Sequence, residues 1–191
     1  MPIDQLIRLG QVRPIVRWGH PVLHAPTRPV TDFGPDLQDL LGDLFATNTA
    51  AEGAGLAAPQ VGVDLAAFDY DCVDADWRRQ RGVVCNPVLE LPQGRDRRLV
   101  SMLEGCLSLP GADAPLSRPD VVTCRGQDQY GRDVELHGTG MLGRCLQHET
   151  DHLRGTVFGD RLPRRLRRRL LDEHERLASH YPGNWPVSQH S

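Results

Sequence analysis

The pentad His148-Glu149-Thr150-Asp151-His152 is the most informative stretch of this 191-residue chain. On a helix, side chains four residues apart lie on one face, so two imidazoles at this spacing can bind one metal ion. The glutamate between them then lies beside any water on that ion and can act as a general base. An ordinary surface helix with two solvated histidines can have the same pattern, so the pentad alone supports a metal site only as a hypothesis.

The residues before the pentad also predict a helix. Apolar side chains recur there at helical spacing, at Met141, Leu142, Cys145 and Leu146. Two further amphipathic helices are predicted, one over residues 36–50 and one over residues 163–180, where Pro163 suits a first helical turn.

The rest of the chain predicts short strands separated by turns. The expected strands cover residues 63–70, 82–91, 98–105, 120–127 and 133–137, the last two joined by a hairpin turn. The segments expected to be irregular cover residues 1–35, 53–62, 71–81 and 109–119. The predicted class is therefore α+β, with antiparallel β-sheets packed around a central helix that carries the pentad, together with an N-terminal helix and a C-terminal helix.

Length and composition favour one domain in a reducing compartment. We expect a single catalytic domain over residues 1–180 and a flexible tail over residues 181–191. The formal net charge of -3 gives no overall field that would favour nucleic acid, so we expect no specific DNA binding. The 5 cysteines are odd in number and lack CxxC spacing, which argues against a disulfide framework. The sequence shows neither a signal peptide nor a membrane-spanning stretch, so a cytoplasmic protein without membrane contact is expected.

The two histidines of the pentad need a third protein ligand to build a catalytic metal site. Downstream of the pentad, the available side chains are Asp160, Glu173, His174 and Glu175. Upstream, Cys106 follows Gly105, which allows a close approach of the backbone, and a cysteine thiolate binds metal well. A free cysteine is more often a small buried hydrophobic residue, so spacing alone leaves this choice open.

Three segments, taken in order, resemble the peptide deformylase family. They are Gly53-Ala54-Gly55-Leu56-Ala57-Ala58-Pro59-Gln60, Glu104-Gly105-Cys106-Leu107-Ser108 and Gln147-His148-Glu149-Thr150-Asp151-His152. The segment Val16-Arg17-Trp18-Gly19-His20-Pro21-Val22-Leu23 is similar to the N-terminal part of that family. The resemblance extends from about residue 13 to about residue 180, which is most of the chain.

This resemblance implies a metal-dependent hydrolase. Cys106, His148 and His152 would bind one divalent ion, Fe(II) in the cell, which Ni, Co or Zn can replace in a purified sample. The implied substrates are nascent peptides that begin with N-formylmethionine. Hydroxide on the metal would attack the formyl carbon, and Glu149 would pass the proton to the leaving amine, so that formate is released.

The resemblance also assigns groups that hold the substrate. The side-chain amide of Gln60 and the backbone N–H of Leu107 would stabilise the negative charge on the formyl oxygen. Gly55 would bind the substrate backbone as if it were an added strand, and Gly105 is also expected to bind the substrate.

The methionine pocket and its support are likewise implied by the resemblance. The residues expected to line this pocket are Met102, Met141 and Cys145. Ala54 is smaller than the Ile or Val common at its position, which would widen the pocket. We expect Glu104 and Arg118 to pair and to brace the loop that carries Cys106.

An arginine run marks the last predicted helix, at Arg164, Arg165, Arg167, Arg168 and Arg169. Its simplest interpretation is a solvated helix face. Because a deformylase meets chains that leave the ribosome, we also expect this helix to contact ribosomal RNA or protein electrostatically.

Two alternatives to a deformylase remain at this point. The pentad alone is compatible with a metal-dependent endopeptidase, which would not require Cys106. A non-catalytic relative could bind N-termini without turnover. The presence of Gln60, Cys106 and Glu149 argues against that second alternative, because a decayed enzyme usually loses one such residue.

Overall fold

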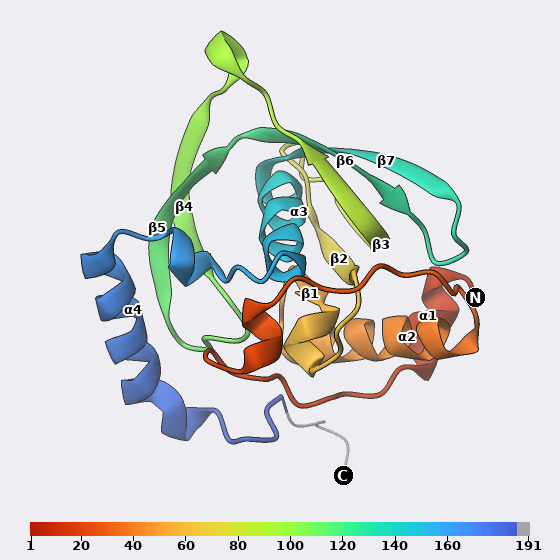
Figure 1. Ribbon diagram of the computed structural model, residues 1–191, viewed down its shortest axis with the longest axis horizontal. Helices are drawn as coiled ribbons and strands as arrows, with labels where there is room; N and C mark the ends of the chain where they lie inside the picture. Colours follow the sequence, from red (N-terminus) through yellow and green to blue (C-terminus); the bar gives the residue numbers. More distant parts are fainter. Residues whose placement is uncertain (187–191) are drawn as a thin grey trace.

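Helix α3 (Gly140–Leu153) stands at the centre of the fold in the computed structural model, which describes residues 1–186 (Figure 1). Residues 187–191, the end of the predicted tail, lie outside the described residues. Every residue from Leu142 to Leu153 is buried, so this helix is covered on all sides. The helix predicted around the pentad is therefore confirmed, and it is a core helix rather than a surface helix.

A five-stranded antiparallel sheet curves around one side of α3 (Figure 1). Its strands, in spatial order, are β1 (Gly55–Ala57), β2 (Ala67–Val73), β3 (Arg79–Glu90), β6 (Val121–Gln127) and β7 (Asp133–Thr139). Strands β6 and β7 form the predicted hairpin, in which Val121 pairs with Thr139. The chain then passes directly from β7 into α3.

A separate two-stranded sheet lies on the other side of α3 and consists of β4 (Leu99–Gly105) and β5 (Asp113–Pro119) (Figure 1). In this sheet Glu104 pairs with Ala114 and Gly105 with Asp113. The end of β4 therefore delivers Cys106 next to α3.

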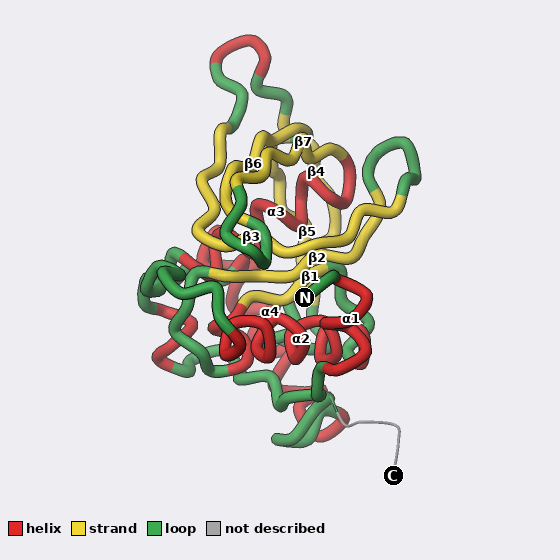
Figure 2. Tube along the Cα trace, turned by 90° about the vertical axis from the view of Figure 1, so that its right-hand side faces the viewer, coloured by secondary structure: helices red, strands yellow, loops and turns green. Residues whose placement is uncertain are grey.

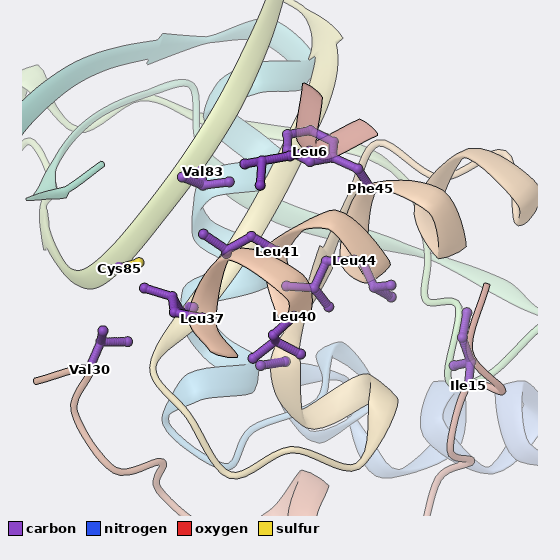
Figure 3. Packing of buried hydrophobic residues seen from close by; sticks show 13 residues of the cluster. Leu6, Ile15, Val30, Leu37, Leu40, Leu41, Leu44, Phe45, Val83 and Cys85 are labelled. Atoms are coloured by element: carbon purple, nitrogen blue, oxygen red, sulfur yellow. The ribbon is translucent and has the colours of Figure 1, made fainter. Parts of the chain in front are cut away.

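Helix α2 (Pro35–Ala50) lies below the larger sheet (Figure 2). Figure 3 shows its apolar side chains Leu37, Leu40, Leu41, Leu44 and Phe45. They pack against Val83 and Cys85 of β3 and against Leu6 of the short helix α1 (Ile3–Leu9). This cluster is the largest apolar core of the described chain, and it supports β1 from beneath.

Helix α4 (Arg164–Leu177) lies at the edge of the molecule beside the two-stranded sheet (Figure 1). Its Leu170 is buried in a cluster with Cys106 and Leu109. Short 3-10 turns occupy Pro21–His24, Ala58–Val61, Gly94–Asp96, Phe158–Arg161 and Ala178–His180. In the expected tail, Trp185 packs on the core cluster, and its carbonyl accepts a hydrogen bond from the N–H of Ile15 at 2.9 Å.

Several local predictions are wrong. Residues 1–35 are not free of helix, because α1 forms there and packs on α2. A Cβ on Gly10 would lie 1.9 Å from the carbonyl oxygen of Gly42, so these two glycines allow the close approach. A seven-residue helix is unstable alone and depends on this packing, which the local sequence does not reveal.

Strand predictions failed where pairing rather than local pattern determines the structure. Strand β1 lies within residues 53–62 and β5 lies within residues 109–119, two segments expected to be irregular. The strand expected over residues 63–70 instead runs from Ala67 to Val73, so it extends into residues 71–81, which were also expected to be irregular. Each of these segments becomes a strand because a neighbouring strand supplies its hydrogen bonds.

Candidate active site

Helix α3 holds the two imidazoles of the pentad side by side. The ring centroids of His148 and His152 lie 5.0 Å apart, and both side chains are buried. The ring of His148 also stacks on Phe158 at 6.0 Å between centroids. Burial lowers the pKa of His152 and so favours the neutral imidazole that can bind a metal ion.

Cys106, directly after β4, completes a set of three candidate metal ligands. Its Sγ lies 3.3 Å from Nε2 of His152. The sulfur and one nitrogen of each histidine all lie within 4.8 Å of one another. Around a tetrahedral zinc ion, bonds of about 2.3 Å to sulfur and about 2.0 Å to nitrogen place these two atoms about 3.5 Å apart. The donor atoms therefore fit one shared ion.

A buried carboxylate orients His148. Nδ1 of His148 and Oε1 of Glu104 are 2.7 Å apart, which leaves Nε2 of that ring as the nitrogen available to an ion. Hydrogen bonds of this kind set the tautomer and the ring direction of a metal-binding histidine.

Glu104 in turn belongs to a buried ion network. Arg118 donates to both of its oxygens, at 2.8 and 2.6 Å, so the pair expected from the sequence is present. Arg118 also donates to Asp151 at 2.9 Å, and Asp151 accepts from Arg161. Burial by itself would raise the pKa of Glu104, but hydrogen bonds from Arg118 and His148 outweigh that effect and hold the pKa well below its ordinary value.

Glu149 lies on the wall of the pocket that adjoins this site. Its side chain is buried, and burial raises its pKa to about 7. Within residues 1–186, its Oε2 has no hydrogen-bond partner. A carboxylate oxygen without a partner beside two imidazoles is in a position to accept a proton from water.

Gln60 is held with its amide directed towards Cys106. Its Oε1 accepts a hydrogen bond from the N–H of Ala57 at 2.9 Å. Its Nε2 lies 3.7 Å from the Sγ of Cys106 and 3.5 Å from the Oγ of Ser108. Gln60 thus makes the local hydrogen bond to the backbone that is common for a glutamine in a loop. That bond uses the side-chain oxygen and leaves the NH₂ group facing the site.

A pocket of about 470 Å³ adjoins the candidate metal ligands and is lined by Cys106 and His148, while His152 is buried behind its wall. The predicted site residues that line it are Ala54, Gly55, Gln60, Glu104, Gly105, Cys106, Leu107, Met141, Cys145, His148 and Glu149. Its size and largely apolar wall suit a medium-sized organic side chain next to a few polar groups.

Met102 is the predicted pocket residue that does not line this pocket. The neighbouring residue, Leu103, lines it instead. Neighbouring side chains on a strand point to opposite faces, so a shift of one position changes which side chain meets the substrate. Met102 is 39% exposed and pairs across the sheet with Leu116.

Sequence reasoning missed Arg144 and Arg161. Arg144 lies on α3 and donates to Glu104 at 2.6 Å, and Arg161 reaches Asp151 from the segment after α3. The position of Arg144 could have indicated a role in the site. It lies on the same helix as Met141, Cys145 and His148, and all four residues line the pocket.

The described part of the chain, residues 1–186, contains no helix that is both long and apolar enough to cross a membrane.

Comparison with known proteins agrees with this geometry. Residues 12–168 match the family model described as polypeptide deformylase. The chain is 51% identical to peptide deformylase 1 of Streptomyces avermitilis over 174 residues, which covers 91% of this chain and 80% of the relative. It is 48% identical to peptide deformylase 2 of Streptomyces coelicolor, covering 90% and 94% of the two chains.

Solved structures show the same fold. The crystal structure of peptide deformylase from Thermus thermophilus matches with a TM-score of 0.75 and 37% identity, over 89% of this chain and 99% of that chain. Peptide deformylase from Ehrlichia chaffeensis in complex with actinonin matches with a TM-score of 0.79 and 30% identity, over 87% and 97%. The chain belongs to the peptide deformylase family.

Proposed function

We propose that this enzyme removes the formyl group from N-formylmethionyl peptides and releases formate. The observation that carries this proposal is the convergence of Cys106, His148 and His152 at a pocket lined by Glu149, in a chain that belongs to the deformylase family. A metal-dependent endopeptidase is not favoured, because the family match covers most of the chain and includes the cysteine.

We assign the metal to Cys106, His148 and His152 as ligands, with Fe(II) as the ion in the cell. One thiolate and two imidazoles also suit Ni, Co and Zn, any of which can occupy the site in a purified sample. When bound there, the ion would lower the pKa of water and polarise the formyl carbonyl. Glu104 holds His148 in the direction that this role requires.

Glu149 acts as the general base and then as the general acid. It is next to His148 in the chain, and its Oε2 is free of partners within the described residues. It takes a proton from the attacking water and gives that proton to the nitrogen of the leaving peptide. Burial excludes bulk water that would compete for the proton.

Gln60 and Leu107 supply hydrogen-bond donors for the negative charge that develops on the formyl oxygen. The Nε2 of Gln60 already points to the Cys106 side of the pocket. Leu107 lines the same pocket, which supports its backbone N–H as the second donor. Such donors act because they are oriented before the reaction begins.

The substrate backbone lies along β1 and the end of β4, at Gly55 and Gly105. A Cβ on Gly55 would lie 2.7 Å from the Sγ of Cys145 and 2.9 Å from the carbonyl oxygen of Asp69, so this position admits only glycine. The methionine side chain then enters the pocket between Met141 and Cys145. With Leu103 at its edge and the small Ala54 in its wall, the pocket accepts side chains somewhat larger than methionine.

An assay on formyl-Met-Ala-Ser tests this function. Protein loaded anaerobically with Fe(II), or with Ni(II), should release formate, and the Glu149→Ala variant carrying the same metal should not. Cleavage within an unblocked peptide would support the endopeptidase. Binding of the formyl peptide without formate release would support the non-catalytic relative.

We further propose that α4 contacts the ribosome and that the enzyme works in the cytoplasm, where its five free cysteines suit a reducing environment. Arg164, Arg165, Arg168 and Arg169 are exposed on α4. The opposite face is anchored by Leu170 in the core, so the charged face is free to bind phosphate. Reversing three of these charges should weaken ribosome binding at low salt, and unchanged binding across salt concentrations would refute the contact.

A further inference from the structure

Arg144 is a buried cation to which the proposed reaction assigns no role. It lies on α3, four residues before His148, and its side chain is only 7% exposed. Burying a guanidinium is costly unless it is paired and hydrogen-bonded, so a buried arginine is usually held by a specific network.

The hydrogen bonds of Arg144 join three elements of the site. Nη1 donates to Oε2 of Glu104 at 2.6 Å and to the carbonyl oxygen of Leu116 at 3.1 Å. Nη2 donates to the carbonyl oxygen of Val100 at 2.9 Å. One side chain on α3 therefore fastens both β4 and β5, the sheet that delivers Cys106, to the helix that carries the two histidines.

Arg144 also completes the surroundings of Glu104. An ionised carboxylate offers about four acceptor positions. Oε1 lies within hydrogen-bond distance of Arg118 and His148, and Oε2 accepts from Arg118 and Arg144. Without Arg144 one position of a buried carboxylate is left empty, and Arg118 alone then holds the carboxylate against His148.

We propose that Arg144 is a positioning residue of the metal site. Through Glu104 it fixes the ring direction of His148, and through the carbonyls of Val100 and Leu116 it fixes the distance between Cys106 and α3. This inference rests on the ligand set proposed above. It predicts that Arg144 determines how tightly the protein binds metal, and not merely how stable the fold is.

The test compares metal affinity with stability in matched variants. Arg144→Met keeps the length of the side chain but removes the charge and every donor, whereas Arg144→Lys keeps the charge with fewer directed donors. Val83→Ala is the control, because Val83 is a buried residue of the α2 core cluster, outside the metal site. The dissociation constant for Ni(II) is measured by competition with a chelator, and the free energy of unfolding is measured on the metal-free proteins.

We expect Arg144→Met to raise the Ni(II) dissociation constant about tenfold, Arg144→Lys to raise it less, and Val83→Ala to leave it within about twofold of wild type. A dissociation constant for Arg144→Met within about twofold of wild type would overturn the proposal, as would an equal loss of affinity in Val83→Ala. If Arg144→Met does not fold, the proposal is tested with Arg144→Lys. A Ni(II) affinity of Arg144→Lys weaker than that of Val83→Ala supports the proposal, and equal Ni(II) affinities of these two variants overturn it.

A Cys106→Ser variant separates this inference from the proposed function. If wild-type protein binds no Ni(II), or if Cys106→Ser binds it as tightly as wild type, the proposed ligand set itself is wrong. If wild type binds one ion through Cys106 and Arg144→Met binds it equally well, only the role of Arg144 is wrong.

Discussion

The Sγ of Cys106 lies 3.3 Å from Nε2 of His152, although 46 positions separate these residues in the chain. The end of β4 and the buried face of α3 bring them together. The candidate metal site therefore exists only in the folded chain, so folding and metal binding are coupled.

Replacing the proposed general base should abolish turnover without releasing the metal. Glu149→Gln preserves size and burial but cannot accept a proton, so formate release from formyl-Met-Ala-Ser should fall by about 10²–10⁴-fold. Ni(II) affinity should stay close to wild type, because the metal is assigned to other side chains. Glu175→Gln, at an exposed position of α4, is the control. Full activity in Glu149→Gln would show that another group moves the proton.

Removing the amide donor of Gln60 should lower kcat more than it raises KM. Gln60→Glu retains an oxygen that can accept from the N–H of Ala57, while the donor nitrogen is lost. Loss of one oxyanion donor costs about 10²–10³-fold in kcat. Steady-state kinetics of the Ni(II) enzyme measure this, with Gln93→Ala in an exposed loop as the control. A change confined to KM would place Gln60 in substrate binding instead.

A methyl group on Gly55 should displace groups that line the proposed substrate pocket. In Gly55→Ala the new Cβ would lie 2.7 Å from the Sγ of Cys145, 2.9 Å from the carbonyl oxygen of Asp69 and 3.1 Å from the Cγ of Glu149, so these groups must move. We expect KM to rise and kcat to fall together, because the pocket and the base are displaced at once. Gly183→Ala is the control, since nothing lies within 4 Å of a Cβ at that position. Kinetics like those of wild type would show that catalysis does not depend on the close packing at Gly55.

The central helix and two of the candidate metal ligands could be predicted from the sequence, for a physical reason. The apolar residues before His148 recur at helical spacing. This pattern depends only on the local sequence, so it indicates a helix without knowledge of the rest of the fold. The resemblance then pointed to Cys106, which periodicity alone left as one choice among several.

What the sequence did not reveal depends on contacts between distant segments. Strand β5 contains two prolines and several polar residues, and it becomes a strand because β4 pairs with it. Whether Met102 or Leu103 meets the pocket depends on the twist and register of β4, which no local pattern encodes. Arg144 is buried because it bonds Val100 and Glu104, which lie 44 and 40 positions earlier in the chain.

The ion pairs that join β2 to β3 should make stability fall in acid. A hydrogen bond from Arg79 lowers the pKa of Asp71 below its ordinary value of 3.8. Because the pKa is lower in the folded state, this stabilisation is complete above pH 3.8 and is lost as the pH falls below that value.

Asp71→Asn should therefore destabilise the protein at pH 7 and have progressively less effect below pH 3.8. Urea unfolding of both proteins over this range measures the difference. Asp172→Asn, whose ion pair with Arg168 is exposed and 3.9 Å long, is the control. A difference between wild type and Asp71→Asn that stays constant with pH would contradict the assignment.

X-ray absorption of the Ni(II)-loaded protein tests the proposed ligand set, because it identifies the atoms bound to the ion. We expect one sulfur and two imidazole nitrogens from the protein, with the sulfur replaced by a lighter atom in Cys106→Ser. A wild-type spectrum without a sulfur neighbour, or one unchanged in Cys106→Ser, would contradict it.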